Sequence, residues 1–217
     1  MDLHRTVTSW MVVGILSAPI GLTGCSPLFF PDQSESSAVP MGAMVDHGMT
    51  MDLGPQDAEF DLRFIDGMIL HHQGAIAMAE AVLQNSQRHE AKQLATNIIA
   101  AQQGEIDQMQ QWRQDWYPDA SSVPVMYDPQ MGHTMAMAPG MQTAMMMAGG
   151  LGPADGEFDL RFINGMIPHH QAALAMAQQV IDNSARPELQ QVAQNILTSQ
   201  QGEIDQMEQW RKDWYGQ

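Results

Sequence analysis

The chain has 217 residues, a formal net charge of −16 and a single cysteine. Such an acidic protein repels nucleic acids and anionic lipid surfaces, so the charge argues against a nucleic-acid partner and favours cations such as metal ions. The solubility of an exported protein explains the acidity equally well. The single cysteine excludes an intramolecular disulfide.

Residues 1–24 predict a bacterial lipoprotein signal peptide, since a basic start is followed by an apolar run and by LTGC at 22–25. Cys25 then carries the lipid anchor on the membrane. We expect a protein of the bacterial cell envelope, either a periplasm-facing or outer-membrane lipoprotein or an extracellular one. An uncleaved anchor and an ordinary secretory signal are alternatives, but the apolar run is shorter than the roughly 20 residues that span a bilayer.

Residues 25–52 are rich in Met, Pro and Ser and show no helical periodicity, which predicts a mobile tail. The stretch MGAMVDHGMTMD (41–52) combines methionine with histidine at short spacings. Its candidate metal ligands are Met44, His47, Met49 and Met51.

The chain contains an internal duplication. Residues 53–117 match residues 151–215 without a gap, with 44 identities in 65 positions. Each copy reads as two amphipathic helices, and a single helical hairpin cannot cover its own apolar face. The sequence therefore predicts an all-α fold, in which hairpins 53–117 and 151–217 pack as one four-helix bundle with pseudo-twofold symmetry.

In the first copy, Asp57 is the predicted N-cap of a helix that ends near Asn85. Apolar residues recur every three or four positions along this helix, and both His71 and His72 fall on that buried face. The second helix starts near Arg88, and its buried seam contains Ile98, Gln102, Glu105, Met109, Trp112 and Trp116.

The second copy differs at two prolines. Pro187 fits the first turn of its second helix. Pro168 replaces Leu70 directly before the histidines, where it removes a hydrogen bond to the carbonyl of Asn164. The resulting kink either opens a metal position beside His169 or is only tolerated.

Residues 118–150 resemble the tail in composition and predict a mobile, Met-rich linker without regular structure. The stretch MGHTMAMAPGM (131–141) supplies a second group of candidate ligands, Met131, His133, Met135 and Met137. Of the 18 methionines that follow the signal peptide, 12 lie in the tail and the linker, where core packing does not explain them.

Methionine and histidine together favour a soft metal ion. Thioether sulfur is neutral and binds Cu(I) or Ag(I) without losing a proton, and it survives outside the cytoplasm better than a thiol does. Copper is therefore the expected metal, as Cu(I) and also as Cu(II), with Ag(I) as a surrogate. The candidate ligands in the helices are Met68, His71, His72, Met78, Met109, Met166, His169, His170, Met176 and Met207.

Each feature also has a structural explanation. The histidines are explained equally well as buried pairs that hydrogen-bond to Glu105 and Glu203, or to Gln102 and Gln200. Such a glutamate either orients a ligand histidine or pairs with Arg63. The methionine-rich stretches are explained as low-complexity linkers, and the tryptophans as packing at the ends of the bundle.

The segments MILHHQGAIAMA (68–79) and MIPHHQAALAMA (166–177), each followed by EIDQM, resemble the signature of the Domain of Unknown Function 305 family. The resemblance covers residues 53–217. It implies a ferritin-like four-helix bundle that binds copper or silver through Met and His. It also implies a periplasmic metallochaperone that supports copper resistance. A copper-exporting or copper-sensing protein is the expected partner.

Three functions compete at this point. The leading hypothesis is a non-enzymatic copper buffer or chaperone. A ferritin-like redox enzyme is a second, but the Glu-x-x-His motif of di-iron bundles is absent, because Met68 and Ile69 stand three residues before the two histidines. The third is a metal-free lipoprotein that acts as an interaction module.

Overall fold

A computed structural model of the chain describes residues 51–146 and 150–217. The predicted signal peptide, the lipid-bearing Cys25 and the candidate ligands Met44, His47 and Met49 lie outside the described residues. No helix in the described ranges is both long enough and apolar enough to cross a membrane.

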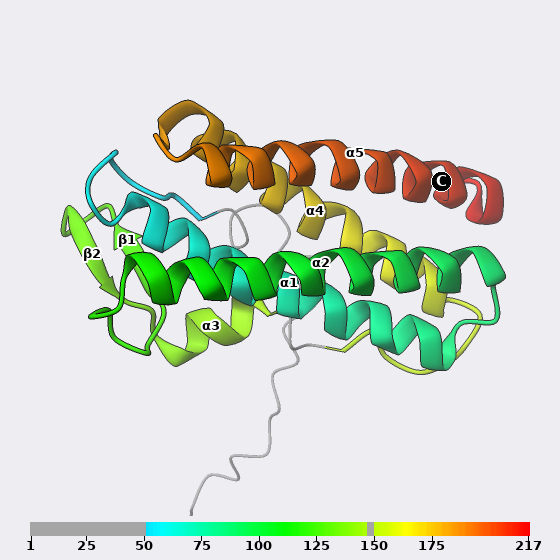
Figure 1. Cartoon of the computed structure of the whole chain (residues 1–217). Helices are drawn as coiled ribbons and strands as arrows, with labels where there is room; N and C mark the ends of the chain where they lie inside the picture. The colour runs from blue at the N-terminus through cyan, green and yellow to red at the C-terminus, as the bar shows by residue number, and fades with distance from the viewer. Residues whose placement is uncertain (1–50, 147–149) are drawn as a thin grey trace, which may run out of the picture. The chain divides into compact units, whose positions relative to one another are not determined.

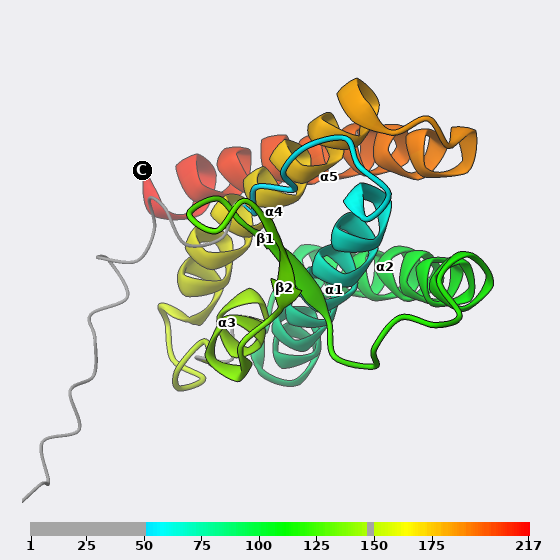
Figure 2. The same ribbon diagram turned by 90° about the vertical axis from the view of Figure 1, so that its left-hand side faces the viewer.

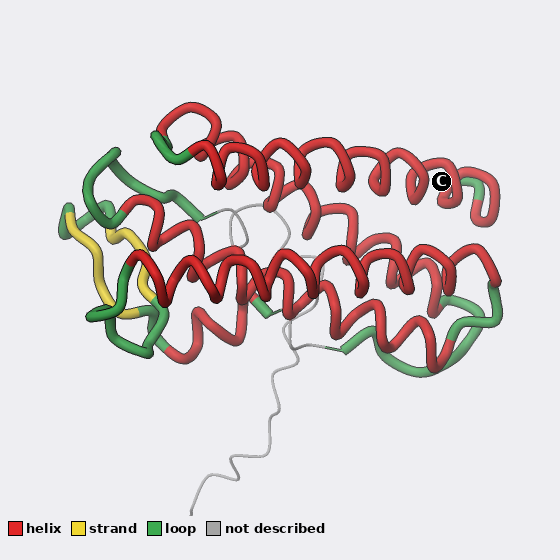
Figure 3. Tube along the Cα trace, viewed as in Figure 1, coloured by secondary structure: helices red, strands yellow, loops and turns green. Residues whose placement is uncertain are grey.

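Four long helices form the core of the fold, as the duplication predicts (Figures 1 and 3). The first hairpin consists of α1 (Phe60–Asn85) and α2 (His89–Trp116), and the second of α4 (Phe158–Asn183) and α5 (Pro187–Tyr215). Within each hairpin the two helices pack side by side, and α1 and α4 form the main helix–helix contact between the hairpins. The predicted all-α four-helix bundle is thus confirmed.

The segment between the hairpins differs from its prediction. It contains β1 (Val125–Asp128), β2 (His133–Ala136) and the short helix α3 (Pro139–Met145), so the predicted absence of regular structure is wrong for these residues. The two strands pair in antiparallel register, and both β1 and α3 pack against α1 (Figure 2). The strands are too short to show a periodic pattern, and contacts with α1 hold them in place.

Arg63 fixes the start of the first hairpin. Its buried guanidinium donates to the carbonyls of Leu53 and Pro55, and also to the hydroxyl of Thr134 on β2 at 2.6 Å. It pairs with the Asp57 carboxylate at 2.9 Å. The predicted N-cap at Asp57 is therefore wrong, because α1 begins only at Phe60 and Asp57 belongs to the turn before it.

The pseudo-twofold symmetry is visible at the two ends of the bundle. The Arg88 guanidinium lies 4.1 Å from the ring centroid of Trp214, and that of Arg186 lies 4.1 Å from the ring centroid of Trp116. Each arginine directly precedes the second helix of its own hairpin and contacts the last turn of the other hairpin. The tryptophans thus pack at the bundle ends, as the sequence predicts.

The two prolines of the second hairpin occupy different positions in their helices. Pro187 is the first residue of α5, as predicted. Pro168 lies inside α4, which continues from Phe158 to Asn183 without interruption. Pro168 therefore does not divide the helix, although its ring removes one backbone hydrogen-bond donor.

The buried apolar side chains form two clusters. The first lies on the side where the β1–β2 hairpin packs and is called here the hairpin-side cluster. It combines the start of α1 and the end of α2 with the end of α4 and the start of α5, and it includes residues of the tail and linker. The second, called the opposite cluster, combines the remaining halves of the same four helices. Every long helix contributes to both clusters, so each helix crosses a boundary between them.

Candidate metal centre

A polar layer occupies the boundary between the two apolar clusters. On α1 and α4, the adjacent histidines separate the residues that belong to one cluster from those that belong to the other. On α2 and α5, a glutamine and a glutamate occupy the same level. The members of this histidine layer are His71, His72, His169, His170, Gln102, Glu105, Gln200 and Glu203.

The layer brings the two copies of the duplicated unit together. The ring centroids of His71 and His169 are 3.6 Å apart, with an angle of 40° between the ring planes. These residues are equivalent positions of the two copies, so the pseudo-twofold axis places one beside the other. Both side chains are buried, with 1% and 0% of their surface exposed.

The second histidine of each pair is held by a glutamate of its own hairpin. Glu105 Oε2 lies 2.7 Å from His72 Nε2, and Glu203 Oε2 lies 2.6 Å from His170 Nε2. An ionised carboxylate only accepts hydrogen bonds, so the Nε2–H group donates, and any lone pair of the ring is then on Nδ1. The interpretation of the glutamates as partners of histidine is therefore supported, and the alternative pairing of Glu105 with Arg63 is wrong.

The remaining imidazole nitrogens are unsatisfied. Both nitrogens of His71 and His169 and the Nδ1 atoms of His72 and His170 have no hydrogen-bond partner among the described residues. The side-chain oxygens of Gln102 and Gln200 lack one as well. Each buried polar atom without a partner lowers the free energy of unfolding by about 1–3 kcal/mol, so as a purely structural feature this layer would destabilise the fold.

The central pair stays neutral at physiological pH. Burial lowers the pKa of His71 well below its usual value of 6.5, and the nearby His72 and His170 lower it further. The pKa of His169 is lowered in the same direction by burial and by the other three histidines. Neutral imidazole is the form that binds a metal, so at pH 7 no proton competes for these lone pairs.

The candidate methionines of the helices flank the layer on both sides. All of them are buried, but Met68 and Met78 belong to different clusters. Ten residues of helix separate them by about 15 Å, so the two cannot bind one ion together.

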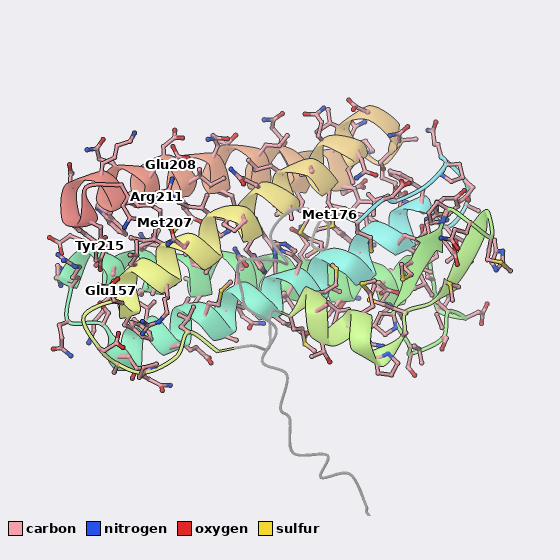
Figure 4. All side chains as sticks on the ribbon, turned by 180° about the vertical axis from the view of Figure 1, so that it is seen from behind. Glu157, Met176, Met207, Glu208, Arg211 and Tyr215 are labelled. Carbon is pink, nitrogen blue, oxygen red and sulfur yellow. The ribbon has the colours of Figure 1, made fainter. Side chains whose placement is uncertain are left out.

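The methionines group across the two copies instead, as one set of three in each cluster. Met176 and Met207, one from each set, lie apart along the bundle (Figure 4). The two sets are Met68, Met109 and Met176 in the hairpin-side cluster, and Met78, Met166 and Met207 in the opposite cluster.

The candidate ligands of the tail and linker are divided by burial. Met51 and Met137 are buried in the hairpin-side cluster, although no sequence pattern predicts a core position for either residue. His133 lies on the exposed face of the strand pair, and Met131 and Met135 are 67% and 41% exposed. The predicted group 131–137 is therefore not a single cluster, because β2 ends at Ala136 and the chain beyond the strand turns Met137 inward.

Two further methionines of this region, one buried and one partly buried, were not among the predicted ligands. Met145 is 3% exposed in the hairpin-side cluster, and Met126 packs against that cluster. Met126 is also the cross-strand partner of Met135. The run of three methionines at 145–147 was the only sequence signal for Met145.

The described residues contain no group of three or more His, Cys, Asp or Glu side chains arranged to hold a metal ion. A surface hollow between α2 and α5, lined by residues such as Gln108, Trp112 and Glu188, contains none of the four buried histidines. The histidine layer lies between two sets of buried thioethers, and imidazole and thioether are ligand types that suit soft ions such as Cu(I) and Ag(I).

Comparison with known proteins identifies the family. Residues 35–211 match the family described as "Domain of unknown function (DUF305)". The chain belongs to this family. The resemblance of its two HHQ segments to the family signature is thereby confirmed.

Solved structures of the family show similar folds. The Cu(I)-bound form of CopM is 38% identical, with a TM-score of 0.55 over 71% of this chain and 97% of CopM. A putative secreted DUF305 protein from Streptomyces coelicolor is 28% identical, with a TM-score of 0.55 over 70% of this chain and 90% of that protein. CopM has also been crystallised in Cu(II)-bound and Ag-bound forms.

A curated relative, the uncharacterized protein L153 of Acanthamoeba polyphaga mimivirus, is 41% identical over 49 residues. The match covers 23% of this chain and about a third of that protein, 32% of its length. It extends the sequence relationship beyond the solved structures and assigns no activity.

Proposed function

We propose that this DUF305 protein binds Cu(I), and Ag(I) in its place, at the histidine layer and the methionines beside it. The observation that carries the proposal is the set of buried, unpartnered imidazole nitrogens on His71 and His169. They lie between two sets of three buried thioethers, one in each apolar cluster. The copper-bound and silver-bound forms of CopM support the same chemistry, since CopM shares 38% of its aligned residues with this chain.

The residues present fit a monovalent soft ion. Neutral imidazole and thioether ligands add no negative charge, so they suit Cu(I) better than a divalent ion in an apolar core. Glu105 and Glu203 orient the outer histidines, and such partners of ligand histidines typically change metal affinity by about 10–100-fold when removed. No group is assigned a covalent step, so the proposed role is binding and transfer of the ion.

The cellular role follows from the N-terminal sequence. A lipid-anchored Cys25 would hold the protein on the envelope side of a bacterial membrane, where it buffers copper or delivers it to an exporting or sensing protein. Such a location fits methionine ligands, which resist oxidation better than cysteine does. Loss of copper tolerance after deletion of the gene tests this part of the proposal.

Anaerobic titration of the chain with Cu(I) against a chromophoric chelator tests the binding itself. The informative variant is His71→Leu with His169→Leu, which removes the unpartnered nitrogens and keeps the core apolar. His89→Leu is the matched control, because His89 is exposed at the start of α2. We expect the double variant to bind at least one Cu(I) fewer than the wild type and the control variant to bind as the wild type does.

Two other outcomes contradict the proposal in different ways. If the double variant keeps the full Cu(I) stoichiometry and differs only in thermal stability, the histidines are structural and the exposed methionines bind the copper. If the wild type binds no Cu(I), copper binding itself is excluded and the metal-free interaction module becomes the better hypothesis.

A further inference from the structure

The hairpin-side cluster contains more methionine than the opposite cluster. Six of its buried side chains are thioethers, against three in the opposite cluster. The helices contribute three to each cluster, as the pseudo-twofold symmetry requires. The excess consists of Met51, Met137 and Met145, which all come from outside the four long helices.

Two of these side chains converge at a glycine of α1. A Cβ atom on Gly67 would lie 3.2 Å from Met51 Sδ and 3.9 Å from Met145 Cε. Gly67 therefore leaves the space in which the two side chains meet, directly beside Met68 in the chain. This contact joins the segment before the first hairpin to the segment between the hairpins.

Specific contacts hold both segments in place. The Gln179 side chain accepts a hydrogen bond from the Leu53 amide at 2.9 Å and donates one to the Met51 carbonyl at 3.0 Å. The Asp66 carboxylate accepts a hydrogen bond from the amide of Val125 at 2.9 Å, at the start of β1. Met51 is thus fixed from α4, and the strand pair that leads to Met137 is fixed from α1.

The two copies differ at the residues that make these contacts. The equivalents of Gly74 and Asp66 in α4 are Ala172 and Asn164, and the equivalent of Gln179 in α1 is Ala81. At Gly74 the main chain of Met146 packs so closely that a Cβ atom would lie 2.8 Å from its carbonyl. The two copies have therefore diverged at positions that seat the extra methionines on one side of the bundle.

Core packing alone does not require methionine here. Leucine has a similar volume and is the usual choice for a well-defined core, and in the opposite cluster Leu, Phe and Trp accompany the three helical thioethers. Three further thioethers on one side, all from outside the four long helices, form a neutral donor set with no titratable member. Such a set binds a soft monovalent ion without releasing protons.

We propose that Met51, Met137 and Met145 form a second soft-metal site with Met68, made only of thioether ligands and separate from the histidine layer. This inference rests on the proposed function and adds to it a site that exists on one side of the bundle only. The ion it takes is Cu(I) or Ag(I). The site holds its ion at pH values at which imidazole ligands are protonated.

The test uses the full chain carrying His71→Leu and His169→Leu, which removes the central imidazoles. To this background is added either Met51→Leu, Met137→Leu and Met145→Leu, or the control triple Ile98→Leu, Ile163→Leu and Ile204→Leu from the opposite cluster. Each triple exchanges three buried side chains for leucine and retains volume. We expect the first triple to lose one Cu(I) equivalent, or to weaken it at least tenfold in chelator competition, and the control to retain it.

Each other outcome overturns the proposal. Equal losses in both triples would point to a general softening of the core, and no loss in the first triple would place the remaining copper elsewhere. If the wild type binds Cu(I) and the histidine background binds none, the layer accounts for all binding and only this second site fails. No binding by the wild type refutes the proposed function and this inference with it.

A spectroscopic measurement covers the case in which a triple variant does not fold. X-ray absorption at the copper edge of the His71→Leu, His169→Leu protein, loaded with one Cu(I), reports the ligand atoms directly. We expect a shell of sulfur only. A nitrogen in that shell would contradict an all-thioether site.

Discussion

Acid should destabilise the apoprotein through the central histidine pair. His71 and His169 are buried, and their pKa values lie well below 6.5 in the folded state. In the unfolded chain they return to about 6.5. Below that pH the unfolded state binds more protons than the folded state, so the free energy of unfolding rises with pH. The stabilisation is fully present above pH 6.5 and is lost as the pH falls below it.

The size of this change in unfolding free energy follows from the number of histidines that titrate. If a histidine stays neutral in the folded state, lowering the pH from about 7.5 to about 5.5 removes about 1.4 kcal/mol of stability. The two histidines of the pair therefore account for up to about 2.7 kcal/mol over this range. Small domains are stable by only about 5–15 kcal/mol, so the effect is easily measured.

The assay is urea unfolding of the metal-free protein, with a chelator present, at several pH values. His71→Leu with His169→Leu is the comparison variant, because it lacks both titrating groups while all carboxylates remain. The difference in unfolding free energy between the two proteins should change by up to about 2.7 kcal/mol in favour of the variant as the pH falls. Parallel pH profiles would refute the reasoning, since they would mean that the two histidines take up protons equally well in the folded state.

Two further predictions concern the asymmetry between the copies. Gly74→Ala should lower the unfolding free energy by about 1–3 kcal/mol in urea, because its Cβ atom would meet the main chain of Met146 at 2.8 Å. Gly104→Ala in α2, where a Cβ atom meets nothing, should instead raise it by about 0.5–1 kcal/mol, and equal effects at the two positions would contradict the close contact. Pro168→Leu, which introduces the residue of the first copy, should raise the melting temperature and the unfolding free energy, by up to about 3 kcal/mol, because α4 regains a backbone donor. An unchanged or lower melting temperature would show that the bundle is adapted to the proline.

The fold was predictable because its signals are local and repeated. The periodicity of the apolar residues defines four helices, and the duplication shows that they form two equivalent hairpins. The burial of His71 and His72 follows from the same periodicity, and the structure agrees at 1% and 0% exposure. The partner of His72 remained open between glutamate, glutamine and a metal, because a helical pattern gives the face of a residue and not the residue opposite.

The rest of the candidate site depends on tertiary contacts that produce no periodic pattern in the sequence. Met51, Met137 and Met145 lie in stretches without amphipathic pattern, and their burial arises only when those stretches dock on α1 and α4. The pairing of His71 with His169 likewise depends on how the two hairpins meet. Composition indicated unusual methionine use, but it did not divide the buried thioethers from the exposed ones.

The duplication itself explains why the centre of the bundle is the place for a ligand. A pseudo-twofold axis places each nearby residue beside its equivalent in the other copy. One histidine of the duplicated unit therefore produces a pair of imidazole rings whose centroids are 3.6 Å apart. A pair of equal rings offers two equivalent lone pairs, an arrangement that two-coordinate soft ions accept. Away from the axis the copies are separated and free to diverge, as Gly74 and Ala172 have done. A site on the axis is therefore shared by both hairpins, whereas a site beside Gly67 belongs to one side of the bundle alone.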